Sequence, residues 1–178
     1  MRAAACLGAV LLCAQAYAQD TVRVAVEAYG NGVRVAAEVD VRASRAVAWK
    51  ILSDYDRWAE FMPELKVSRV VSREPLRVEQ RGGLSWLPGL PIVVVADVVE
   101  TPGERVHFKK IQGNVAFLEG EWRLSPVKGG TRVAYRAVVE PGFPLPVSVS
   151  LDIFREDTRA KVEAMAQEIM RQARNRKK

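Results

Sequence analysis

The sequence predicts an α+β fold in which a curved antiparallel sheet of about seven strands wraps around one long C-terminal helix, with two short helices after the first strand. Three observations support this prediction. Apolar and polar residues alternate along successive segments that short turns separate. The last long segment instead has apolar residues three and four positions apart, which is typical of an amphipathic helix. A sheet with one apolar face needs a cover, and only this helix is long enough to provide it.

The first eighteen residues have the features of a secretory signal peptide. Arg2 gives a positive start, residues 3–14 are mostly apolar, and residues 16–18 form a small-x-small cleavage motif. The apolar stretch is shorter than the roughly 20 residues that a membrane span needs. We therefore expect an exported protein, periplasmic if the source is a Gram-negative bacterium. An N-terminal core helix is the alternative.

Turn signals divide the following chain into strands. The tripeptide Gly30-Asn31-Gly32 separates the first two, and Asn-Gly is a strong hairpin signal because both residues accept a positive φ. Later separators contain proline or glycine in the same way. The expected strands cover residues 21–29, 33–41, 66–73, 77–85, 92–101, 105–112, 116–125 and 131–140.

Helical signals occur at two places in the chain. Ser44 is a good N-cap for a helix over residues 45–54, and a second short helix over about residues 57–62 ends at Pro63. The long helix covers about residues 149–172. Its apolar stripe consists of Leu151, Phe154, Thr158, Val162, Met165, Ala166, Ile169 and Met170.

Three stretches of the chain carry a family resemblance. They are the strand-to-helix junction 39–55, the short helix 55–63 with its terminal proline, and the closing hairpin 120–143 with its Gly129-Gly130 turn. These stretches resemble the START-like (SRPBCC) superfamily, which includes polyketide cyclase/dehydrase, coenzyme Q-binding and lipid-carrier domains. The resemblance runs from about Gly32 to Arg171. It implies a helix-grip domain over residues 32–178, with residues 19–31 as an extra N-terminal strand.

The resemblance also implies a hydrophobic small molecule, such as a lipid, quinone, sterol or polyketide-like compound, in a cavity between the sheet and the C-terminal helix. Members of the superfamily act as carriers, cyclases or accessory subunits, so the fold alone does not choose among these functions.

Few residues suit catalysis or metal binding. His107 is the single histidine, and both cysteines lie in the first eighteen residues, so neither a metal site nor a cofactor is expected. No nucleophile elbow, phosphate-binding glycine loop or His-Glu-x-x-His motif occurs. The weak catalytic candidates are Tyr135, His107 and Asp97, a lone acid within an apolar strand. The net charge is +6, but no basic stripe contains interleaved aromatics, so nucleic acid is not an expected partner.

Apolar side chains concentrate on one face of the sheet and in two loops. One face of the last two strands carries Leu118, Gly120, Trp122 and Leu124 together with Val133, Tyr135, Ala137 and Val139, and it should face the helix. The loops contain Trp86 with Leu87 and Phe143 with Leu145, although loops normally face water. These loops could border a cavity mouth that transiently touches a membrane, or fold back to plug the core. The predicted ligand-binding residues are Trp58, Phe61, Met62, Trp86, Leu90, Trp122, Tyr135, Phe143, Phe154 and Met165.

Three functions fit this sequence. An exported carrier of a hydrophobic molecule needs only an apolar cavity, since each buried CH₂ contributes about 0.8 kcal/mol. A cyclase or dehydratase would act on a polyketide-like substrate mainly by positioning it. A protein-interaction module would use the two apolar loops and would have a filled interior.

Overall fold

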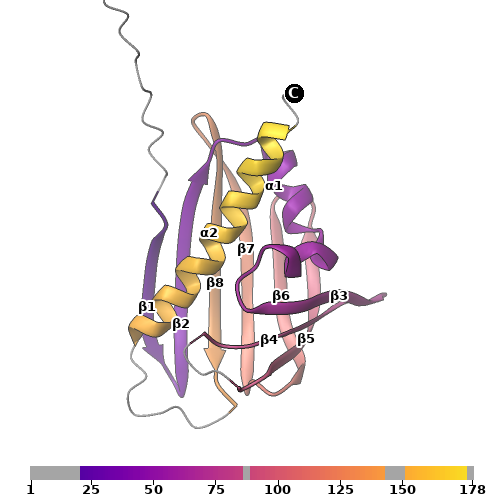
Figure 1. Cartoon of the computed structure of the whole chain (residues 1–178), viewed down its shortest axis with the longest axis vertical. Coiled ribbons are helices and arrows are strands. Elements are labelled where there is room, and N and C mark those ends of the chain that lie inside the picture. Colours follow the sequence, from indigo (N-terminus) through magenta and orange to yellow (C-terminus); the bar gives the residue numbers. More distant parts are fainter. Residues whose placement is uncertain (1–20, 86–88, 143–150, 176–178) are drawn as a thin grey trace, which may run out of the picture.

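The computed structural model describes residues 21–85, 89–142 and 151–175. Over these residues, eight antiparallel strands form one curved sheet, and a long helix crosses one face of it (Figure 1). This is the helix-grip architecture that the sequence predicts. The strands are β1 (Arg23–Tyr29), β2 (Gly32–Val41), β3 (Leu65–Arg73), β4 (Leu76–Gly82), β5 (Ile92–Thr101), β6 (Arg105–Gly113), β7 (Phe117–Val127) and β8 (Gly130–Glu140).

The strand order is β1-β2-β8-β7-β6-β5-β4-β3, so the count is eight rather than about seven. The additional strand is β1, which extends the sheet along β2 from the pair Arg23–Glu38 to the pair Tyr29–Gly32. A two-residue turn holds β1 beside β2. Its first residue, Gly30, has a φ of 58°, as a hairpin turn with glycine in the first central position requires. The turn therefore lies one residue before the predicted Asn-Gly pair.

The helices follow the predicted order with changed ends. Helix α1 (Arg45–Leu52) begins at Ser44, whose Oγ accepts a hydrogen bond from the Val47 amide at 3.4 Å. The second short helix is a 3₁₀ helix, η1 (Tyr55–Glu60), and it starts two residues earlier than predicted. Helix α2 (Leu151–Asn175) crosses the sheet diagonally, with α1 beside its C-terminal end (Figure 1).

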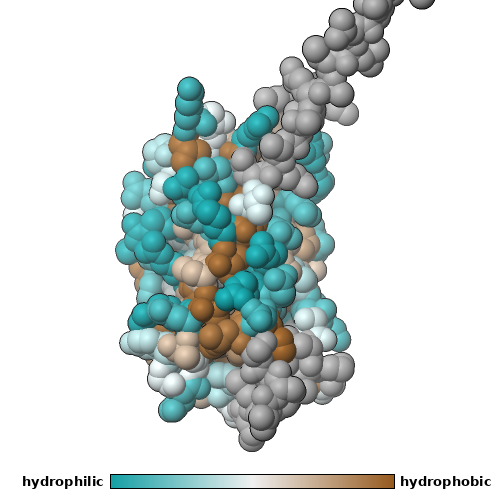
Figure 2. Space-filling view, turned by 90° about the vertical axis from the view of Figure 1, so that its left-hand side faces the viewer, coloured by the Kyte–Doolittle hydropathy of each residue, from teal (hydrophilic) through white to brown (hydrophobic). Residues whose placement is uncertain are grey.

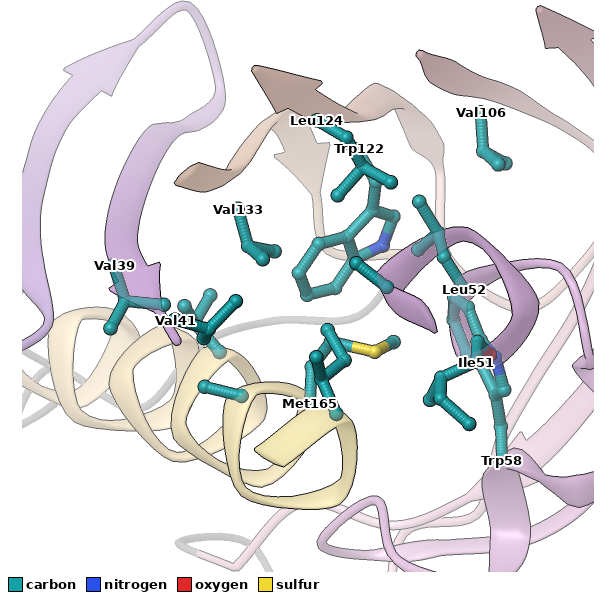
Figure 3. Packing of buried hydrophobic residues seen from close by; sticks show 14 of the residues in the cluster. Val39, Val41, Ile51, Leu52, Trp58, Val106, Trp122, Leu124, Val133 and Met165 are labelled. Atoms are coloured by element: carbon teal, nitrogen blue, oxygen red, sulfur yellow. The ribbon is translucent and has the colours of Figure 1, made fainter. Parts of the chain in front are cut away.

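A tightly filled core occupies the space between α1, the sheet and the C-terminal half of α2. Met165 projects from α2 toward Trp122, with Leu52 and Trp58 on one side and Val41 on the other (Figure 3). Both Met165 and Leu52 are 0% exposed. This end of the helix–sheet interface has the close packing of an ordinary protein interior.

The face of the molecule drawn in Figure 2 is mainly hydrophilic. Figure 2 shows a narrow hydrophobic band on the side that carries β1, bordered by hydrophilic residues. On the outer face of the sheet, charged residues pair across strands, as Arg132 does with Asp40 at 2.7 Å. Among the described residues, no helix is both long and apolar enough to cross a membrane.

Candidate functional site

A cavity of about 250 Å³ lies between the sheet and the N-terminal half of α2. Its volume is slightly below the roughly 300 to 1,000 Å³ that is usual for small-molecule sites. Alternation along each strand sends one set of side chains into this space and the other set to the outer face. The apolar part of the wall includes Val35, Val78, Ile92, Val94, Ala96, Val98, Val106, Phe108, Val115, Leu118 and Val139.

A continuous series of aromatic rings forms one side of the cavity. Tyr55, Trp58, Trp122, Tyr135 and Phe108 follow one another with centroid separations of 5.7, 6.1, 4.7 and 6.1 Å. All five line the cavity. Such ring pairs contribute about 0.5 to 1.5 kcal/mol beyond the area that they bury, and they give the wall a defined shape.

Gly120 leaves the space that one of these rings occupies. It lies opposite Phe108 on β6 and Ala137 on β8. A Cβ at this position would approach Phe108 Cζ and Ala137 Cβ to 2.8 Å each, closer than real Cβ atoms come. The glycine therefore allows the Phe108 ring to lie over Tyr135 with an interplanar angle of 14°.

An ion pair interrupts the apolar wall on the helix side. Asp157 and Lys161 both line the cavity, and the Lys161 ammonium lies 2.6 Å from Asp157 Oδ2. Burial lowers the pKa of Lys161, but attraction to Asp157 and Tyr135 offsets this effect, so the net direction is upward. Burial also raises the pKa of Tyr135, which keeps the phenol neutral at neutral pH. The cavity thus contains one charged pair and one hydroxyl close together.

Sequence reasoning missed Asp157 and Lys161, although a signal was present. Lys161 follows Thr158 by three positions and Phe154 by seven, so it falls within the apolar stripe of the helix. A lysine in such a stripe with an aspartate four residues before it predicts a charged pair on the buried side. Thr158 is itself buried and lines the cavity.

The structure does not place all the predicted ligand-binding residues in the cavity wall. Met165 belongs to the filled core rather than to the cavity, because it lies one turn beyond Lys161, where α1 closes the space. Phe61 lines a separate hollow beside Met170, and half-buried Leu90 is not part of the wall. Trp86 and Phe143 lie outside the described residues. The predicted residues in the cavity wall are Trp58, Met62, Trp122, Tyr135 and Phe154.

The three catalytic candidates are not brought together. His107 faces outward from β6, with Nε2 3.3 Å from Glu119 Oε1. Asp97 faces outward from β5 and accepts a hydrogen bond from Arg77 at 2.8 Å. Their neighbours in the strands, Val106 and Ala96 among them, take the inward positions, so only Tyr135 reaches the cavity.

Several connections between strands meet at one end of the cavity. The Asn114 side chain joins two of them: its Nδ2 donates to the Pro91 carbonyl at 2.7 Å, and its Oδ1 accepts from the Val93 backbone amide at 2.9 Å. Leu84 and Pro141 belong to the wall, and each leads toward a segment outside the described residues. The predicted membrane-contacting residues Trp86, Leu87, Phe143 and Leu145 belong to those segments.

Metal ligands do not gather in the part of the chain that the structure describes. Over these residues, no three His, Cys, Asp or Glu side chains are placed to hold a metal ion together. The chemistry available in the described cavity is therefore apolar contact, one ion pair and a few hydrogen-bonding groups.

Solved structures with this fold come from several bacteria. A STAR-related lipid transfer protein from Xanthomonas axonopodis is 16% identical, with a TM-score of 0.69 over 83% of this chain and 93% of that one. A START superfamily protein from Mycobacterium smegmatis is 18% identical, with a TM-score of 0.63 over 80% and 97% of the two chains. The Zhui aromatase/cyclase from a Streptomyces species, strain R1128, is 16% identical, with a TM-score of 0.59 over 88% and 96%.

The sequence comparison gives the family. No curated protein sequence matches the chain. Residues 41–166 match the family described as polyketide cyclase / dehydrase and lipid transport. This match includes every strand that lines the cavity except β2, of which it contains only Val41, and it reaches past Lys161 on α2. The chain therefore belongs to the polyketide cyclase / dehydrase and lipid transport family.

Proposed function

We propose that this protein binds and carries a hydrophobic small molecule in the cavity between its sheet and α2, and that it does so after export from the cytoplasm. The cavity carries this proposal: an apolar space of about 250 Å³ is lined by aromatic and aliphatic side chains. Six buried methylene groups would contribute about 5 kcal/mol of transfer free energy. Such a site can hold its ligand without any catalytic group.

The outward direction of His107 and Asp97 favours a carrier over an enzyme. A general acid or base must come within hydrogen-bonding distance of the substrate, and neither residue faces the cavity. The open volume also argues against a pure interaction module, for which a filled interior is expected.

A cyclase or dehydratase is the second candidate. Tyr135, Asp157 and Lys161 line the same apolar cavity, and such groups could orient a polyketide-like substrate and move a proton. One of the structural neighbours is described as an aromatase/cyclase. The two functions differ in the fate of the ligand, because a carrier releases the compound unchanged.

Native mass spectrometry of the protein purified from its source organism tests the carrier proposal. We expect a hydrophobic compound to be bound to the purified protein. Its mass should not change when the extracted compound is incubated with the protein again. Ala96→Phe is the control, because Ala96 lines the cavity and the larger ring would occupy the ligand's space. Absence of any extracted compound, together with failure to bind the neutral probe N-phenyl-1-naphthylamine, would reject the proposal. A changed ligand mass would favour the cyclase.

Export rests on the first eighteen residues and has its own test. We expect the protein in the envelope or extracellular fraction, with the mass of a chain that starts at Gln19. A cytoplasmic protein that retains residues 1–18 would contradict export and leave the ligand-binding proposal intact.

A further inference from the structure

The Asp157–Lys161 pair gives the cavity a chemical preference. Each residue bears a full charge, and together they are neutral at a nitrogen–oxygen distance of 2.6 Å. Most of the surrounding wall is hydrocarbon, where an unpaired charge is strongly disfavoured. The remaining ionisable residues of the wall are placed differently. Glu64 is exposed, and the Tyr55 hydroxyl donates to Glu100 at 2.6 Å.

Charge balance decides which ligand head groups fit beside this pair. A carboxylate would add a second negative charge next to Asp157, and an ammonium would add a second positive charge next to Lys161. Either ligand leaves one uncompensated charge against a mostly hydrocarbon wall, where the Lys161 and Asp157 side chains are 39% and 19% exposed, and this is less favourable than a balanced pair. A neutral group leaves the balance unchanged.

Hydrogen-bonding capacity narrows the choice further. A lysine ammonium has three donors, so Lys161 can serve Asp157 and still donate to an oxygen of the ligand. The Asp157 carboxylate can accept from a hydroxyl, and the neutral Tyr135 phenol can donate or accept. A hydroxyl or carbonyl oxygen satisfies these groups, whereas a pure hydrocarbon does not.

We propose that the cavity selects neutral amphiphiles that have an apolar body and a hydroxyl or carbonyl group, and that this group binds beside the Asp157–Lys161 pair. This inference rests on the proposed ligand-binding function. It states the substrate class of the cavity: long-chain alcohols, ketones, phenols and related compounds, in preference to free fatty acids and amines.

Three ligands with the same chain test this selection: decanol, decanoate and decylamine at neutral pH. Each is titrated against N-phenyl-1-naphthylamine bound to the full chain. Wild-type protein is expected to bind decanol most tightly. Since an alcohol also enters apolar sites more readily in general, the variants provide the decisive comparison.

Removing one charge should shift the relative affinity for the two charged ligands toward the one whose charge is opposite to the remaining residue. Lys161→Met leaves Asp157 unpaired and should improve decylamine relative to decanoate by about tenfold or more. Asp157→Asn leaves Lys161 unpaired and should shift the same ratio in the opposite direction. The double variant should restore the wild-type order. Lys161→Gln replaces Lys161→Met if the latter does not fold.

Arg155→Met is the matched control. Arg155 also pairs with an acid on α2, Asp152, but neither residue lines the cavity, so the ligand order should not change. If the relative affinities for the three ligands stay within about twofold of wild type in both charge variants, the inference is overturned, while the ligand-binding proposal stands. Failure of the neutral probe to bind wild-type protein rejects the proposed function and this inference with it.

Discussion

The two halves of α2 meet the sheet in different ways. In the C-terminal half, Met165 and Ile169 are both 0% exposed and pack into a continuous core. In the N-terminal half, Phe154 and Lys161 face a cavity of about 250 Å³. The same helix therefore closes a core at one end and covers a hollow at the other.

The elements between helix and sheet explain this difference. At the C-terminal end, α1 packs against α2 (Figure 1). Its residues Ala48 and Leu52 belong to the buried core. At the other end, no described helix lies between α2 and the sheet, and the small side chain of Ala96 faces the space. We therefore attribute the hollow to two features: no second described helix packs between α2 and the sheet at this end, and Ala96 on the facing strand is small.

The largest expected difference in protein stability is between two methionine-to-alanine variants, one in the filled core and one at the cavity. Met165→Ala is expected to lower the free energy of unfolding by about 2 to 5 kcal/mol, because it opens a void in a filled core. Met62→Ala should cost clearly less, since Met62 already has the cavity on one side and makes fewer contacts there. Denaturant titration of both variants measures the difference. Equal losses would contradict the comparison.

Enlarging one alanine at each end gives the converse comparison. Ala48→Leu should destabilise the protein by about 1 to 3 kcal/mol, because Ala48 is 0% exposed and the core has no room. Ala96→Leu adds the same atoms to the cavity, so we expect little change in stability and weaker binding of N-phenyl-1-naphthylamine. Thermal unfolding and probe fluorescence test both effects. A large destabilisation by Ala96→Leu would show that the cavity end is filled.

The smallest expected effect concerns an ion pair on the outer face of the sheet. The hydrogen bond from Arg132 lowers the pKa of Asp40 below its usual value. A lowered pKa in the folded state stabilises the protein above the ordinary carboxyl pKa, and this stability is lost as the pH falls through the folded value. Asp40→Asn should therefore cost at most about 1 kcal/mol at neutral pH. The difference from wild type should vanish in acid.

Denaturant titration of both proteins between neutral and acidic pH measures this effect. A difference that stays constant down to about pH 2 would exclude the carboxylate as its source. The pair also serves as a reference for Asp157–Lys161, whose loss should change ligand preference, whereas loss of Asp40–Arg132 should not.

Alternation and turn chemistry predicted the strands and their inward faces well. Trp122 and Tyr135 face inward because period-two alternation holds wherever one face of a sheet is covered. Periodicity also placed Met165 and Phe154 on the same stripe of α2, but it cannot tell where along the helix the interface opens. That depends on α1 and on Ala96, which come from distant parts of the chain.

The charged part of the site was harder to predict. An apolar stripe is identified by its hydrophobic members, so the pattern did not single out Lys161 and Asp157. Their partners in the cavity come from β8 and from the aromatic wall, and only the folded chain brings them together. The single histidine, His107, is a catalytic candidate by its chemistry alone, and its strand position directs it outward.

Xenon binding to crystals under pressure tests the central claim most directly, because xenon enters dry apolar cavities as small as about 150 Å³. We expect an anomalous peak bounded by Val94, Ala96 and Phe108, and none beside Met165. A crystal structure in which side chains fill the first position, with no xenon there, would contradict the account.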